Sequence, residues 1–278
     1  MDSSQPTSRV VDVPGGRLHV IDQGAGVPIL LLHAGIVDAR AWEPLMDHLA
    51  AAGYRAVAFD RRGSGRSVTQ DVPFSNRDDV RAVMDALGIG RACLVGNSIG
   101  GQIAVDVAVE TPERVVALVT VAANVGGYEP EPTPGEAAMF EEMERLEEDR
   151  TPDEVADFDV RAWVDGLGQP ETRVPAEIRE LVRAMARDNG DRERVRGRPI
   201  PMQPRAADRL TALTMPVLAV AGDLDVSDVA ATARHLAEVV PGATALVLPS
   251  VAHMIGLEAP DALAAAILRL LEPLAHWG

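Results

Sequence analysis

The stretch Gly96-Asn97-Ser98-Ile99-Gly100-Gly101 decides the fold, because it joins a short apolar run to an amphipathic segment. Residues 92–95 before it have the length and composition of a buried strand, and helical spacing follows it to Glu110. A G-x-S-x-G sequence in this setting is typical of a nucleophile elbow, whose serine sits on a strained turn and whose glycines let strand and helix pass closely. Ser98 is therefore the candidate nucleophile, with the helix N-terminus aimed at developing negative charge.

On both sides of this stretch, short apolar runs alternate with helical segments. Strands are expected at residues 9–13, 18–22, 29–32, 55–59, 92–95, 114–121, 217–221 and 243–248, the first two joined by a turn at Pro14-Gly15-Gly16. Helices are expected at residues 42–52, 76–87 with Ser75 as cap, 99–110, 228–240 and 260–271. Strands that are apolar on both faces predict an α/β fold, with a parallel sheet covered by helices on both sides.

The alternation stops between residues 126 and 205, where no strand-like run occurs. Helices are expected at 136–149, from Thr151 onward and at 175–188, and a loop at 188–204. The second helix has a clear start, since Thr151 as cap is followed by Pro152 and by Glu154 three residues on. We therefore divide the chain into a sheet domain, residues 1–125 and 206–278, and a helical cap, residues 126–205.

The predicted cap is acidic. It carries 20 acidic residues and 12 arginines, which is half of the net charge of −16. We interpret the acidic run at 141–149 as a solvated helix face. The charge disfavours a strongly anionic substrate.

A nucleophilic serine needs a base. Of the six histidines, His253 follows the last predicted strand at the carboxyl edge of the sheet, where Ser98 also lies. His33 ends another strand at this edge and is the competing candidate, although its neighbours favour a role in organising a loop. His253 is the preferred base.

The base needs an acid to orient it. Asp225 follows the strand at 217–221 and is the preferred residue, with Asp223 and Asp228 as weaker alternatives. The resulting chain order, serine, aspartate, histidine, is the order expected for this type of sheet.

A developing oxyanion needs hydrogen-bond donors. The backbone N–H of Ile99, directly after the nucleophile, is one candidate, and the loop after the strand at 29–32 should supply the other. Gly35 is preferred there because glycine allows close backbone approach, and Ile36 is the alternative. The candidate substrate-binding residues are Ile36, Asn124 and Trp163, of which Trp163 lies in the predicted cap.

Taken together, these motifs resemble the α/β-hydrolase fold superfamily. They are residues 31–35 with Trp42, residues 59–67, the elbow, residues 222–225, residues 241–243 and residues 252–254. The resemblance implies an eight-stranded, mostly parallel sheet with a helical cap inserted after strand six. It also implies that residues 60–67 form a structural turn beside the pocket. The chain departs from the family at His33-Ala34, where His-Gly is usual.

The resemblance implies a hydrolase with a serine nucleophile, which excludes the branch that uses aspartate. Our first hypothesis is the cleavage of a carboxylic ester or lactone of a small molecule. The alternatives are cleavage of a C–C bond, as in the meta-cleavage hydrolases whose elbow Gly96-Asn97-Ser98 resembles, and a cofactor-free perhydrolase. A non-hydrolytic cyclase or a ligand-binding protein on the same fold is the alternative of another class.

The composition limits which kinds of binding partner and cofactor are expected. A hydrophobic content of 47% can form a sizeable core, and the net charge of −16 argues against nucleic acid. No apolar run approaches the roughly 20 residues that span a bilayer, and residues 1–6 lack the blocks of a signal peptide, so we expect a cytoplasmic protein without a membrane partner. With Cys93 as the single cysteine and no metal or nucleotide motif, we expect no metal and no cofactor. A homodimer is left open.

Overall fold

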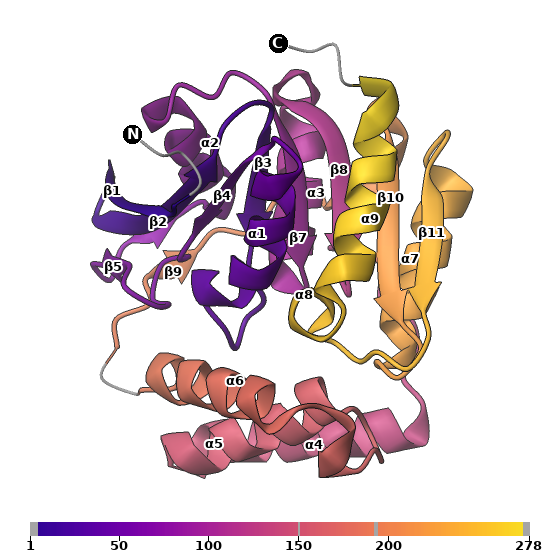
Figure 1. Ribbon diagram of the computed structural model, residues 1–278. Coiled ribbons are helices and arrows are strands. Elements are labelled where there is room, and N and C mark those ends of the chain that lie inside the picture. The colour runs from indigo at the N-terminus through magenta and orange to yellow at the C-terminus, as the bar shows by residue number, and fades with distance from the viewer. Residues whose placement is uncertain (1–4, 150, 192–193, 275–278) are drawn as a thin grey trace.

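The computed structural model describes residues 5–149, 151–191 and 194–274, and its central feature is a nine-stranded sheet (Figure 1). Residues 1–4, which belong to the segment 1–6 that lacks the blocks of a signal peptide, lie outside the described residues. Eight strands follow the order β1-β2-β4-β3-β7-β8-β10-β11, and the short β5 pairs with β2. Their bounds are β1 Thr7–Val13, β2 Gly16–Gly24, β3 Pro28–Leu32, β4 Arg55–Phe59, β5 Val68–Thr69, β7 Ala92–Asn97, β8 Val115–Val121, β10 Val217–Gly222 and β11 Thr244–Leu248.

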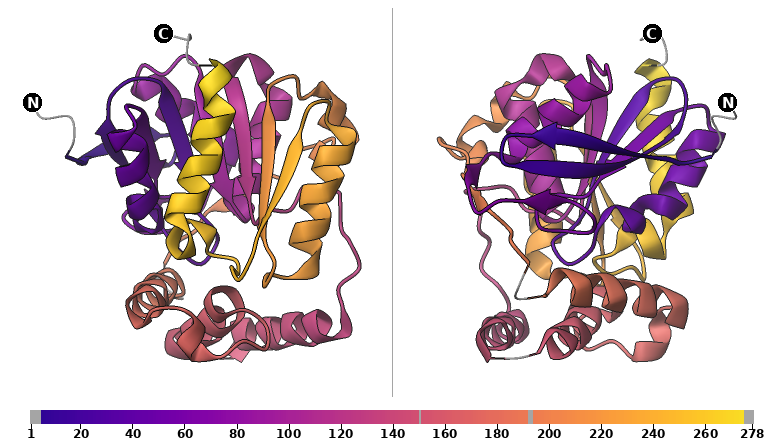
Figure 2. Two further views of the ribbon diagram at one scale, coloured as in Figure 1. Left: turned by 45° about the vertical axis from the view of Figure 1, so that its right-hand side comes forward. Right: turned by 90° about the vertical axis from the view of Figure 1, so that its left-hand side faces the viewer.

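The sheet is parallel from β4 to β11 and antiparallel at β1 and β2. Helices α1 and α9 pack together on one face, and α2 and α3 pack on the other (Figure 2). Helix α7 packs on β10 and β11. The helix bounds are α1 Glu43–Ala51, α2 Asn76–Ala86, α3 Ile99–Glu110, α7 Ser227–Val239, α8 Ile255–Glu258 and α9 Pro260–Leu271. The predicted α/β fold with a mostly parallel sheet is confirmed.

The burial of the strands follows their place in the sheet. Every residue of the central strands β7 and β8 is buried, as their apolar sequences predict. β11 is less buried than the central strands, since only Leu248 of this strand is buried. β11 is an edge strand that pairs with β10 alone, so one of its sides has no neighbouring strand.

Two helix starts are confirmed in detail. Ser75 caps α2, where its hydroxyl accepts a hydrogen bond from the backbone N–H of Asp78. Thr151 begins α5 with a complete capping box. Its hydroxyl accepts from the N–H of Glu154, and the Glu154 carboxylate accepts from the N–H of Thr151 at 2.9 Å. These starts were predictable because each depends only on residues within one helical turn.

Three helices form a separate layer beyond the carboxyl ends of the parallel strands (Figures 1 and 2). They are α4 Pro134–Asp149, α5 Pro152–Asp159, which continues as a π-helical turn at Val160–Asp165, and α6 Ala176–Asn189. We call this layer, residues 134–189, the lid. Short 3₁₀ turns occur at Ala39–Trp42, Pro112–Arg114, Glu171–Arg173, Ala206–Ala212 and Glu272–Leu274.

The segment after the lid differs from the prediction of a loop without strands. Strand β9, Arg198–Pro199, pairs with β6, Pro73–Phe74, in a separate two-stranded sheet. Met202 then joins the hydrophobic core of the sheet domain. A two-residue strand has no periodicity to detect, and its partner is more than 120 residues away along the chain. The last part of the predicted cap therefore packs on the sheet domain.

Within the ranges that the structure covers, no helix combines the length and the apolar character needed to cross a lipid bilayer.

Candidate active site

The turn at Ser98 is strained and leaves no room for side chains beside it. Ser98 has φ of 56° and ψ of −124°, and its N–H donates to the carbonyl of Val121 at 2.9 Å. A Cβ on Gly96 would lie 2.3 Å from the carbonyl oxygen of Gly100, and a Cβ on Gly100 would lie 2.2 Å from that of Leu32. Backbone atoms cannot yield at such distances, so both positions require glycine. The turn has the geometry that the sequence predicts for a nucleophile elbow.

The structure brings Asp225 and His253 together. The Nδ1 atom of His253 lies 2.8 Å from Oδ2 and 3.0 Å from Oδ1 of Asp225. Both side chains are buried, with exposed fractions of 8% and 2%. Because a carboxylate only accepts hydrogen bonds, Nδ1 carries the proton and Nε2 is free to accept another.

The environment of His253 makes it a stronger base than an isolated histidine. Burial lowers the pKa of His253, but the charge of Asp225 and its hydrogen bond raise it, and Asp228 and Glu258 add to the increase. The net result is a pKa above the ordinary value of 6.5. An imidazole held in this way can receive a proton and stabilise the resulting charge.

Ser98 and His253 line the same cavity, about 200 Å³ in volume. No hydrogen bond joins the Ser98 hydroxyl to His253 in the described part of the chain, and such bonds often form only when substrate binds. We call this space the Ser98 cavity. Its apolar wall consists of Ala34, Ile36, Met143, Leu146, Val155, Phe158, Trp163 and Met254. Of the residues that the structure describes, Asp159 is the one carboxylate that lines this cavity, and a neutral, mostly apolar group of modest size fits the rest of the wall.

The candidate oxyanion donors lie on two elements that meet at the Ser98 cavity. Ile99 is the first residue of α3, so its N–H has no acceptor within the helix. Gly35 lines the cavity, and a Cβ built on it would lie 3.9 Å from the Ile99 side chain. Ile36 lines the cavity as well, so the alternative donor stays open.

Asn97 links the elbow to the loop that contains His253, the candidate base. Its side chain is buried, and its Nδ2 donates to the carbonyls of Val121 at 3.0 Å and His253 at 3.3 Å. In the sequence, Asn97 stands out only as part of the elbow motif. No local signal reveals this role, because His253 is 156 residues away along the chain.

Arg173 connects the lid to the loop before His253. Its guanidinium donates to the carbonyls of Val164 and Asp165 in the lid and to the carbonyl of Ser250 at 3.0 Å. It also donates to the Glu258 carboxylate at 2.6 Å, and the exposed fractions of this pair are 13% and 4%. A half-buried arginine with four acceptors holds both segments in one arrangement.

The four hydrogen bonds of Arg173, which we call the clamp, position Trp163 beside His253, the candidate base. The Trp163 ring lies 4.8 Å from the His253 ring, measured between centroids, and both residues line the Ser98 cavity. Trp163 belongs to the π-helical turn whose carbonyls Arg173 binds. The sequence placed Trp163 in the cap, but the clamp that positions it was not predicted.

The competing base, His33, serves a structural role. It is fully buried, and its Nε2 accepts the N–H of Arg61 at 2.9 Å, while its Nδ1 lies 2.7 Å from the carbonyl of Ala34. Burial, together with the charge of Arg61, lowers the pKa of His33 to about 3. Both ring nitrogens are used, so His33 organises the loop and neither nitrogen is free to accept a proton from Ser98.

The alternative acids are also engaged elsewhere. Asp223 accepts the N–H of Ser250 at 2.6 Å, and Asp228 accepts the side-chain N–H of Asn124 at 2.9 Å. The structure does not bring Asn124 to the Ser98 cavity. Asn124 and Asp228 instead line a separate cavity, because the turn after β8 carries Asn124 towards the start of α7. Asn124 therefore does not contact a group bound in the Ser98 cavity.

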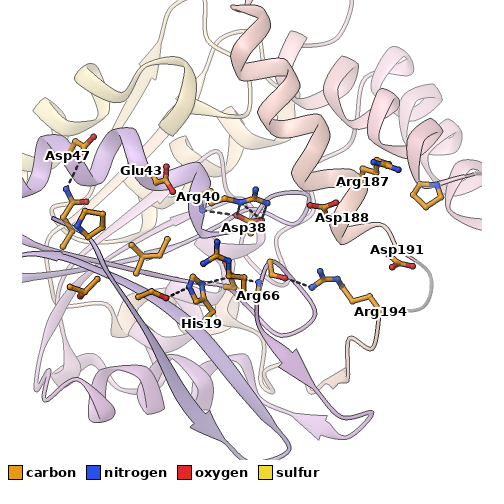
Figure 3. Close-up of a pocket in the computed structure, with 18 residues that line it drawn as sticks. His19, Asp38, Arg40, Glu43, Asp47, Arg66, Arg187, Asp188, Asp191 and Arg194 are labelled. Atoms are coloured by element: carbon orange, nitrogen blue, oxygen red, sulfur yellow. Dashed lines mark hydrogen bonds and ion pairs between the residues drawn. The ribbon is translucent and has the colours of Figure 1, made fainter.

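A larger cavity, about 830 Å³, lies between the end of α6 and the N-terminal strands (Figure 3). Figure 3 shows its charged lining, in which Arg40 pairs with Asp38. His19 bridges Ser8 at 2.8 Å and Asp60 at 3.0 Å, which resembles a triad. Both Asp60 oxygens, however, also accept backbone N–H groups: Oδ2 accepts that of Arg66 in the turn at residues 60–67, and Oδ1 accepts that of Ala39. We assign this network to the structural turn that the resemblance implies.

Among the described residues, no group of three or more histidine, cysteine, aspartate or glutamate side chains is placed to hold a metal ion.

Comparison with known proteins places the geometry in context. The pattern of the Alpha/beta hydrolase family matches residues 29–266. The chain is 30% identical over 274 residues to the rhodomycin D methylesterase DauP of Streptomyces sp. (strain C5), covering 89% of this chain and 91% of that protein. A 2-hydroxy-6-oxononadienedioate/2-hydroxy-6-oxononatrienedioate hydrolase of Paraburkholderia phymatum is 41% identical over 145 residues, covering 46% of this chain and half of that protein. The structure of an N-acyl homoserine lactone degrading enzyme superposes with a TM-score of 0.72 at 27% identity, covering 93% and 98% of the two chains.

Proposed function

Because this chain belongs to the α/β hydrolase family and is an enzyme of that family, we propose that it cleaves a carboxylic ester or lactone of a small organic molecule through an acyl-serine intermediate. The observation that carries the proposal is the buried pair of Asp225 and His253 beside Ser98 on its strained turn. In this proposal Ser98 is the nucleophile, His253 the general base and Asp225 the acid that orients the base.

The proposed reaction has two stages. The Nε2 atom of His253 takes the proton of Ser98 while Oγ attacks the carbonyl carbon, and the N–H groups of Ile99 and Gly35 stabilise the oxyanion. The protonated imidazole then gives its proton to the leaving alcohol, and the C–O bond of the ester breaks. Water attacks the acyl-serine in the second stage with His253 again as base, which releases the acid and restores Ser98.

Two observations favour an ester over a C–C bond. The methylesterase relative aligns with 89% of the chain, whereas the C–C hydrolase relative aligns with 46%. The Ser98 cavity is small and mostly apolar, which suits a compact neutral acyl group or a methyl ester. A lactone is included because an enzyme that degrades acyl homoserine lactones shares the fold at 27% identity. The cytoplasmic location stays a prediction from the sequence, and a homodimer stays open.

The proposal is tested by labelling and turnover. A fluorophosphonate should label Ser98, and the enzyme should hydrolyse aryl and methyl esters of graded acyl size. A vinylogous diketone and hydrogen peroxide with a carboxylic acid serve as comparison substrates. Faster cleavage of the diketone, or peracid formation without ester hydrolysis, would favour one of the alternative reactions. Labelling without any turnover would favour a binding protein or cyclase.

We expect Trp163→Ala to change substrate preference more than stability. Removing the indole enlarges the Ser98 cavity beside His253, so bulky acyl groups should gain in relative kcat/KM over acetyl by about tenfold or more. The measurement is kcat/KM across the ester panel, with Tm alongside. Phe140→Ala is the matched control, since Phe140 packs 6.5 Å from Trp163 without lining the cavity. An equal loss on all esters with a large fall in Tm would assign Trp163 to lid packing alone.

A further inference from the structure

A cavity of about 560 Å³ lies between α3 and the two segments that connect the lid to the sheet domain. We call it the side cavity and define it by Ile99, Gln102, Asp106, Asn124, Met202 and Asp228. It shares no lining residue with the Ser98 cavity. It nevertheless borders the candidate catalytic residues, because Ile99 follows Ser98 and Asp228 lies three positions after Asp225.

Asp106 is a buried carboxylate without a partner in this cavity. It lies on α3, its exposed fraction is 8%, and no described residue forms a hydrogen bond or ion pair with its side chain. It is the one charged residue among the nine buried residues of α3. Burial raises the pKa of Asp106 to about 6. The positive charge of Arg77 lowers this pKa, and the negative charge of Glu110 raises it by less than burial does. A charged side chain buried in this way destabilises the folded protein, whereas valine or alanine at the same position would stabilise the helix. The presence of aspartate here therefore favours a role in binding.

A second carboxylate in the side cavity is only half satisfied. The Oδ2 atom of Asp228 accepts a hydrogen bond from Asn124 at 2.9 Å. Its Oδ1 atom is buried and has no partner among the described residues. The amide of Asn124 is neutral, so the charge of Asp228 is not balanced by this bond. Burial raises the pKa of Asp228 as well, although the Asn124 hydrogen bond opposes the increase.

The cations of the wall are already paired. Arg77 binds the carboxylate of Glu110 at 3.2 Å, and Arg205 binds that of Glu129 at 2.8 Å. Neither guanidinium forms an ion pair with Asp106 in the described structure. Among the described residues, Asp106 and Asp228 therefore have no ion-pair partner in this wall, although the charge of Arg77 acts on Asp106, and they lie beside apolar side chains such as Ile103 and Met202.

We propose that the side cavity binds a small organic amine in its ammonium form, with the charges of Asp106 and Asp228 in the wall attracting the ammonium and the apolar wall in contact with its carbon skeleton. An ammonium group supplies up to three N–H donors and one positive charge, which suits a wall whose carboxylates keep free acceptor capacity. A divalent cation fits less well, because calcium requires six to eight oxygen ligands, and no group of three or more ligating side chains is gathered in the described residues. This site goes beyond the proposed ester hydrolysis and does not depend on it.

The test measures binding without turnover, so that its failure is distinguishable from failure of the proposed reaction. Ser98→Ala protein is titrated with benzylamine and with benzyl alcohol, its neutral counterpart, by calorimetry at pH 8. Benzylamine should bind at least about tenfold more tightly than the alcohol, and calcium should not compete with it. Equal binding of the two probes would overturn the proposal.

Two variants locate the site. Asp106→Asn and Asp228→Asn should each weaken benzylamine binding by about tenfold or more, since each removes one charge at constant shape. Asp78→Asn is the matched control, because this aspartate lies on α2, is 69% exposed and pairs with Arg81. Asp106→Asn should also raise the Tm of the ligand-free protein, since an unpaired buried charge is removed. Unchanged binding in both site variants would mean that the amine binds elsewhere and would refute the assignment.

The pH dependence gives a further check. Asp106 must be ionised to bind an ammonium, so affinity should fall as the pH drops below about 6. The other charged groups that face it are Arg77 and Glu110, with Asp228 and the pair of Glu129 and Arg205 on the cavity wall. Of these, the arginines keep their charge in this range. Affinity that stays constant from pH 8 to pH 5 would contradict a role for Asp106.

Discussion

Ser98→Ala should abolish ester hydrolysis and leave the fold intact. Removing the nucleophile of a serine triad costs on the order of 10⁴-fold or more in kcat. The fold should tolerate the change, because the Ser98 hydroxyl forms no hydrogen bond with the described residues and Ala122 already adopts a positive φ, 46°, in this chain. The measurement is kcat/KM on an aryl ester, with circular dichroism and Tm as tests of folding.

Ser250→Ala provides the matched control for this variant. Ser250 also has a positive φ, 62°, and lies in the loop before His253, but it does not line the Ser98 cavity. The same substitution at a similar φ should keep nearly full activity. If well-folded Ser98→Ala protein retained more than about a tenth of native activity, Ser98 would not be the nucleophile.

Asp225→Asn should lower kcat by roughly 10³- to 10⁴-fold, because an amide cannot hold His253 in the tautomer that leaves Nε2 free. The variant should also move the acid limb of the pH profile. The reaction needs neutral His253, so native kcat/KM rises with pH as the imidazole loses its proton. Burial lowers the pKa of His253, and the charge and hydrogen bond of Asp225 are the main causes that raise it. Without them the pKa falls, and the limb should shift to lower pH.

The comparison variant is Asp223→Asn. Asp223 lies two positions away and accepts the N–H of Ser250, with no contact to His253 in the described structure. It should keep its activity and its pH profile within a few fold. A larger loss for Asp223→Asn than for Asp225→Asn, or an acid limb that does not move in the Asp225 variant, would remove Asp225 from the proposed triad.

Much of this arrangement could be predicted from the sequence because it follows from local rules. The elbow needs glycines at 96 and 100 for steric reasons that the sequence itself displays. The contact between His253 and Asp225 was predictable because both follow strands of one parallel sheet, and the carboxyl ends of such strands share an edge. The helix starts at Ser75 and Thr151 depend on neighbours within one turn. In each case the deciding interaction is local or is fixed by the strand direction.

Other features depend on contacts between distant segments, and only the tertiary structure decided them. The clamp of Arg173 joins residues 85 positions apart, so nothing near Arg173 in the sequence indicates Glu258 as its partner. The place of β11 at the sheet edge follows from strand order, which the apolar pattern of one strand does not encode.

The two cavities show the same division between sequence and tertiary structure. The sequence by itself indicated the α/β architecture and the elbow at Ser98, and it made Asp225 the preferred partner of His253 with Asp223 and Asp228 as alternatives. It could not determine that Asn124 lines the side cavity while Trp163 lines the Ser98 cavity, because the shape of a cavity depends on how several segments pack at once. Side-chain periodicity specifies which face of an element is buried, whereas the empty space between elements is specified only by their final arrangement.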